Sequence, residues 1–100
     1  MKHAGARALD SLEPLLILIR SRTDLVERRR GVFYRGGTAF LHFHEDPAGL
    51  FADMKVDGTF RRSPVNTAAQ QSALFRRAVR LGRRVGRDGG RVNQEGRRSV

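Results

Sequence analysis

Two histidines, His42 and His44, are the residues whose type and spacing point most directly to chemistry. They stand two positions apart in an apolar stretch that predicts a strand, so their side chains project from the same face. Two imidazoles on one face form half of a typical divalent-metal site, and Asp53 on the next expected strand would add an oxygen ligand. The sequence does not fix the register that would bring Asp53 beside them.

Two other interpretations of the histidine pair stay open. In the first, His42 and His44 are half-exposed positions of an ordinary amphipathic strand and bind nothing. In the second, they act as general acid and base on RNA, and Arg35, Arg61 or Arg62 stabilises the phosphate charge. The sequence contains no glycine-rich phosphate loop followed by a helix, so a nucleotide site of that kind is not expected.

Composition restricts the classes of protein that fit. The chain has 100 residues, of which 39% are hydrophobic and 30% charged, so one hydrophobic core and a single domain are expected. It contains no cysteine, which excludes disulfide scaffolds, thiolate metal sites and cysteine nucleophiles. Its formal net charge of +10 favours anionic partners, either nucleic acid or an acidic protein.

The basic charge is carried mostly by arginine. Phe33, Tyr34 and Phe51 would add stacking surfaces for bases if they are exposed. The arginines that we expect to contact phosphates or an acidic partner are Arg28, Arg29, Arg30, Arg35, Arg61, Arg62, Arg76, Arg77 and Arg80.

Positioning of these residues depends on the strands at the centre of the chain. Strands are expected at 32–35, 38–44 and 50–56, with a short fourth at 59–62. Gly36-Gly37 predicts a two-residue hairpin turn, and 45–49 predicts a longer turn. In the second strand Phe40 is expected on the half-exposed face, while Phe33, Phe43 and Phe60 are expected in the core with Phe75. The result is an antiparallel meander of three or four strands.

Helices are expected on both sides of this meander. Ser11 as N-cap places Pro14 in the first turn of a helix, although a strand through 15–19 is an alternative. Thr67 and Gln70 form a capping box for a second helix that ends at Gly82. We therefore expect an α+β fold, with a mobile leader at 1–9, one domain at 10–82 and a disordered Arg/Gly-rich tail at 83–100.

Neither export nor membrane insertion is expected. The apolar run at 15–19 is far shorter than the roughly 20 residues that a membrane-spanning helix requires. Glu13 and Pro14 interrupt it, and no small-residue cleavage site follows. We expect a cytoplasmic protein without a membrane partner, and a homo-oligomer could form through the exposed face of the sheet.

Several segments also carry a resemblance to known sequences. They are Gly31-Val32-Phe33-Tyr34-Arg35, Ala39-Phe40-Leu41-His42-Phe43-His44-Glu45-Asp46-Pro47, Leu50-Phe51-Ala52-Asp53 and Pro64-Val65-Asn66-Thr67. Across about residues 9–82 the chain resembles a group of short uncharacterised bacterial proteins. The order of elements is also similar, in topology alone, to the frataxin-like MmcQ/YjbR proteins, although the chain has no Trp. Neither resemblance implies an activity.

These observations lead to one expectation and one alternative. We expect a non-catalytic binding module without an obligatory cofactor, whose partner is nucleic acid or an acidic protein. The alternative is a small enzyme, either metal-dependent or ribonuclease-like, centred on His42 and His44. In that case a divalent metal would be bound by His42, His44 and Asp53.

Overall fold

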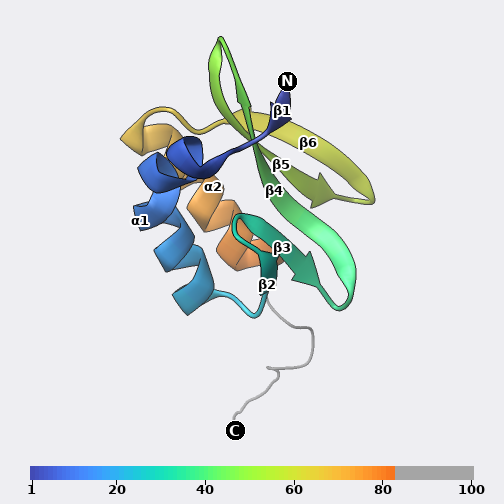
Figure 1. The fold of residues 1–100 in the computed structure, drawn as a ribbon. Coiled ribbons are helices and arrows are strands. Elements are labelled where there is room, and N and C mark those ends of the chain that lie inside the picture. Colours follow the sequence, from blue (N-terminus) through green and yellow to red (C-terminus); the bar gives the residue numbers. More distant parts are fainter. Residues whose placement is uncertain (83–100) are drawn as a thin grey trace, which may run out of the picture.

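Two helices lie against one face of an antiparallel sheet in the computed structural model, which describes residues 1–82 (Figure 1). The α+β order of helix, meander and helix is confirmed, and the meander has more strands than the sequence predicted. The elements are β1 (Lys2–His3), α1 (Ala6–Arg22), β2 (Val26–Arg29), β3 (Val32–Arg35), β4 (Thr38–Asp46), β5 (Gly49–Val56), β6 (Thr59–Pro64) and α2 (Ala68–Leu81).

Strand β4 organises the sheet because it has neighbours along its whole length. The strands β2 to β6 follow one another in the order of the sequence, and β1 is added beside β4. One edge of β4 pairs with β5. The other edge is shared, since β3 pairs with its first half up to His42 and β1 pairs with its second half at His44 and Glu45. Residues from the start of the chain therefore lie next to the middle of the sequence.

The core lies between the helices and the inner face of the sheet. Phe33, Leu41 and Met54 point from neighbouring strands toward α1 and α2, and all three are fully buried. Helix α1 contributes five buried residues, at Leu9, Leu12, Leu15, Leu16 and Ile19. In β5, Ala52 and Met54 are buried on the helix side as predicted, whereas Asp53 faces the other way and is buried as well. Neither helix of residues 1–82 covers the opposite face of the sheet, which we call the uncovered face (Figure 1).

The first helix and the expected leader differ from the sequence prediction. Helix α1 begins at Ala6 with Gly5 as N-cap, so Pro14 is in its interior. Leu9 explains the earlier start, because it is buried and packs against Gly31. The helix tolerates Pro14 on its exposed side, where the missing backbone donor faces away from the core. Residues 2–3 form β1, so the expected mobile leader is wrong for this segment.

Phe40 and Phe60 also differ from expectation. Phe40 is buried at 4% exposure, because the β3–β4 register shifts by one residue between Phe33 and Tyr34 and turns Phe40 inward. Phe60, expected in the core, is 40% exposed on β6. It pairs with Lys55 and therefore points to the uncovered face. The uncovered face thus has an exposed aromatic ring.

The second helix has the predicted ends. The Thr67 hydroxyl accepts a hydrogen bond from the backbone N–H of Gln70 at 3.1 Å, and the Gln70 side chain accepts one from the backbone N–H of Thr67. The backbone N–H of Gly82 closes the helix on the carbonyl of Ala78. The disordered tail expected at 83–100 lies outside the described residues. Within residues 1–82, no helix is long and apolar enough to cross a membrane.

Candidate metal centre on the uncovered face

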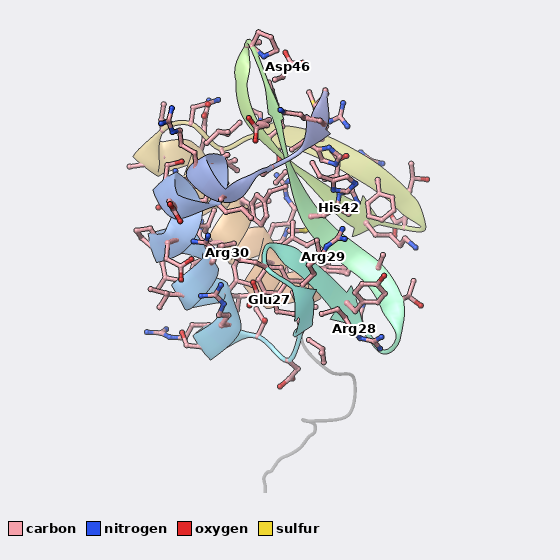
Figure 2. All side chains as sticks on the ribbon, in the orientation of Figure 1. Glu27, Arg28, Arg29, Arg30, His42 and Asp46 are labelled. Atoms are coloured by element: carbon pink, nitrogen blue, oxygen red, sulfur yellow. The ribbon has the colours of Figure 1, made fainter. Side chains whose placement is uncertain are left out.

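All three histidines of the chain meet on the uncovered face of the sheet. His3, His42 and His44, here called the histidine cluster, each offer a ring nitrogen, and these nitrogens lie within 4.8 Å of one another. The ring centroids are 4.7 Å apart for His3 and His44, and 4.9 Å apart for His42 and His44. Figure 2 shows His42 projecting from β4 on the side away from α1.

The pairing of the strands explains this convergence. His42 and His44 share a face because they are two positions apart on β4. His3 is the direct cross-strand partner of His44, and paired residues of antiparallel strands point to the same face. The same rule places Asp53 opposite His42, and Arg62 opposite Asp53. Four strands therefore supply the polar groups of this site.

Strand β1 is held in place by two hydrogen bonds just beyond it. The backbone N–H of Ala4 donates to the carbonyl of Phe43 at 3.0 Å. The backbone N–H of Gly5 donates to the Glu45 carboxylate at 2.6 Å. Because these bonds connect the start of α1 to β4, they fix the position of His3 over His44.

Asp53 is the anchor of the cluster and is not free to act as a ligand. Arg62 donates to both of its carboxylate oxygens, each at 2.8 Å. These hydrogen bonds lower the pKa of Asp53 below its ordinary value, so it is ionised near neutral pH. The oxygen Oδ2 also lies 3.3 Å from Nε2 of His44. Asp53 can therefore orient the ring of His44.

Burial keeps the two strand histidines in the form that binds metal. Desolvation lowers the pKa of His42, and the charge that His44 would carry lowers it further. Desolvation is also the main cause that lowers the pKa of His44. Both rings are therefore neutral near pH 7, and neutral imidazole is the ligating form. The contact of 2.9 Å between His42 Nδ1 and His44 Nε2 also requires a donor on one ring and an acceptor on the other.

The arrangement fits a three-histidine metal site after a small adjustment. Zn–N distances of about 2.0–2.1 Å place tetrahedral ligand nitrogens about 3.3 Å apart, so the widest separation in the cluster must close by roughly 1.5 Å. His3 is exposed and can supply most of this movement. Nδ1 of His44 is buried without a hydrogen-bond partner among the described residues, so the cluster alone leaves a ring nitrogen unsatisfied.

The structure brings the three expected metal ligands together and adds a histidine, His3, that the sequence did not suggest. His42 and His44 adjoin as predicted, and Asp53 lies beside them but is bound by Arg62. His3 takes the remaining position. The sequence carried one signal for His3. The chain has three histidines, and two of them were already expected on one face of a strand.

The nine arginines expected to bind a partner do not form one surface. Arg28 and Arg30 point to opposite sides of the sheet (Figure 2), and Arg30 forms ion pairs with Asp10 and Glu13 of α1. Arg29 and Arg62 lie in the same row of cross-strand partners as His42, on the uncovered face. The others lie at the β3–β4 turn, on the helix side of β6 or on α2: Arg35, Arg61, Arg76, Arg77 and Arg80.

A cavity of about 880 Å³ lies away from the histidine cluster. Its lining includes Arg28, Arg35 and Lys55 together with the β3–β4 and β5–β6 turns, and no histidine lines it. The candidate metal centre is therefore a surface site on an open sheet face, separate from this hollow.

Comparison of the chain with protein-family models, with curated proteins and with solved structures finds no match.

Proposed function

We propose that the protein binds a divalent transition-metal ion through His3, His42 and His44. The observation that supports this most is that every histidine of the chain, drawn from two strands some 40 positions apart in sequence, meets in one cluster. Imidazole nitrogen suits Zn²⁺, Ni²⁺, Co²⁺ and Cu²⁺, and Zn²⁺ is the natural probe because it is bound by three histidines with an open fourth position.

The surroundings support a binding role. The cluster lies on a face that no helix covers, so water or a group from a partner can occupy the fourth position. Asp53, paired with Arg62, approaches Nε2 of His44, and a carboxylate that orients a metal-binding histidine in this way leaves the other ring nitrogen, Nδ1, to bind the metal. We keep the expectation of a binding module, with the metal as the ligand and with no reaction assigned.

Isothermal titration calorimetry with Zn²⁺ tests this proposal on tag-free protein that has been freed of metal with a chelator. We expect one equivalent to bind to the wild type, and the triple variant His3→Gln, His42→Gln, His44→Gln to show no saturable heat. Arg61→Gln, which changes the helix side of β6, serves as the matched control and should bind as the wild type does. Equal binding by the triple variant would overturn the proposal.

The variant Asp53→Asn tests whether Asp53 orients His44 or binds the metal directly. If Asp53 only orients His44, Asp53→Asn should weaken Zn²⁺ binding by about tenfold, the effect typical of groups behind the ligands. Abolished binding would instead make Asp53 a direct ligand, as the sequence had suggested.

A further inference from the structure

The uncovered face of the sheet presents aromatic rings and cations in a defined pattern beside the histidine cluster. Tyr34 and Phe60 both project from this face, and Phe60 is 40% exposed. The guanidinium carbon of Arg28 lies 4.8 Å from the centre of the Tyr34 ring, and Nζ of Lys55 lies 5.1 Å from that of Phe60. Each ring is therefore accompanied by its own cation.

We propose that this face binds single-stranded nucleic acid. A nucleotide combines a flat base with a phosphate, and a ring next to a mobile cation matches both parts. The long side chains of Arg28 and Lys55 can turn from the ring to a phosphate when a base takes their place. The stacking face is defined here as Arg28, Tyr34, Lys55 and Phe60.

The charge of the neighbouring residues favours a polyanion over a second copy of this basic chain, and the exposed rings favour bases over an acidic peptide. The cross-strand row that runs over five strands contains Arg29, Val32, His42, Asp53 and Arg62. Its one acid, Asp53, is buried and neutralised by Arg62. No unpaired acid in this row would repel a phosphate, and two copies of the chain would bring like charges together.

The spacing of the rings indicates a strand rather than a single nucleotide. Tyr34 on β3 and Phe60 on β6 are three strand spacings apart, which is roughly 14 Å. A chain of several nucleotides is therefore needed to reach both rings.

Fluorescence anisotropy with labelled oligonucleotides of about 12 nucleotides tests the proposal, a length within the usual range for stacking platforms. RNA and DNA strands are compared with a duplex of the same length, in the presence of a chelator and at two salt concentrations. We expect either single strand to bind more tightly than the duplex, with an affinity that falls as salt is raised. Equal affinity for the duplex would overturn the stacking proposal.

Two matched sets of variants locate the surface. Tyr34→Leu with Phe60→Leu should weaken binding at least tenfold while the thermal melt shows a folded protein. Arg28→Gln with Lys55→Gln should also weaken it. Arg76→Gln with Arg80→Gln removes the same charge from α2 on the other side of the sheet and should change the affinity by less than twofold. Equal losses in the two charge sets, or no loss in the aromatic set, would contradict the proposal.

Two further comparisons complete the test. An acidic peptide should fail to displace the oligonucleotide, and displacement at similar concentration would instead favour a protein partner. The ring of Phe60 lies 4.8 Å from that of His42, so a Zn²⁺ titration of the variant Tyr34→Leu, Phe60→Leu shows separately whether the metal site survives. Because the oligonucleotide is titrated with a chelator present, loss of metal binding does not by itself change the oligonucleotide result.

Discussion

A single carboxylate determines how the histidine cluster behaves. Asp53 is buried, accepts two hydrogen bonds from Arg62 and approaches His44. Buried charge is tolerated only when it is paired, and Arg62 provides the pairing. Without that pairing, the free carboxylate would attract a proton or a histidine charge.

Arg62→Met should therefore destabilise the fold more than Arg61→Met does. The two positions are neighbours on β6 and point to opposite faces, since Arg61 pairs with Met54 and Arg62 with Asp53. The first change leaves the buried carboxylate of Asp53 unpaired and raises its pKa, whereas the second removes only an exposed charge. Urea unfolding at neutral pH should show a lower midpoint for Arg62→Met alone. Equal midpoints would show that the pair contributes nothing.

The histidines should make the metal-free protein less stable in mild acid. Folding lowers the pKa of His42 and of His44 from the ordinary value of 6.5, chiefly by burial, so protonation favours the unfolded chain. Their contribution to stability is complete above pH 6.5 and is lost as the pH falls through the lowered values. Urea midpoints measured with a chelator between about pH 7.5 and about pH 5 should fall for the wild type.

The double variant His42→Gln, His44→Gln provides the control for this pH dependence. It should show a flatter profile over the same interval, because Gln does not titrate. The contribution of Asp53 belongs to a lower window, since its pKa is lowered from 3.8 and its stabilisation is lost only as the pH falls below that value. An unchanged slope in the double variant would assign the pH dependence to other groups.

At the scale of elements, the early start of α1 depends on a contact with the β2–β3 turn. Gly31 has a φ of +78°, and a Cβ built there would lie 2.7 Å from Cδ2 of Leu9. Gly58, in the β5–β6 turn, has a similar φ of +81° and open space around it. Substitutions at the two glycines therefore separate the cost of backbone strain from the cost of crowding against Leu9.

Gly58→Ala should cost about 1 kcal/mol from its left-handed conformation alone. Gly31→Ala should cost about 1 kcal/mol more, because the buried side chain of Leu9 must also move. Denaturant unfolding of both variants measures the difference. A cost for Gly31→Ala no greater than that for Gly58→Ala would show that Leu9 repacks freely and does not hold α1 to the turn.

The metal site should depend on how firmly β1 is held on β4, because this contact places His3 beside His44. Glu45→Gln weakens the hydrogen bond from Gly5 that fixes β1 on β4, so Zn²⁺ affinity should fall by about tenfold although every ligand is retained. Asp57→Asn removes an equal charge from the β5–β6 turn, at a position with a φ of +52° that Asn also tolerates. Calorimetry should show a small effect for Asp57→Asn, and equal losses in the two variants would mean that Glu45 acts through its charge alone.

At the scale of the whole molecule, the sequence predicted the layers well and the meeting of distant segments poorly. The hairpin at Gly36-Gly37 followed from residue types, and both glycines have positive φ. The capping box at Thr67 and the two faces of β5 also followed from local patterns. Such signals are contained within a few neighbouring residues, so a single sequence is enough to recognise them.

The remaining features depend on contacts that are distant in sequence. β1 has only two residues, too few for a pattern, and its place beside β4 depends on bonds from Ala4 and Gly5. Pro14 indicated a helix start, but the burial of Leu9 extended the helix beyond it. His3 was missed for the same reason, and with it the third member of the histidine cluster.

The most direct measurement is an anomalous difference map at the zinc absorption edge, from crystals of the tag-free protein grown with Zn²⁺. We predict one strong peak on the uncovered face, at about 2.0–2.1 Å from a ring nitrogen of each of His3, His42 and His44. Asp53 should remain bound to Arg62 beside the peak. A map without a peak at these histidines, or with Asp53 in place of His3, would contradict the account.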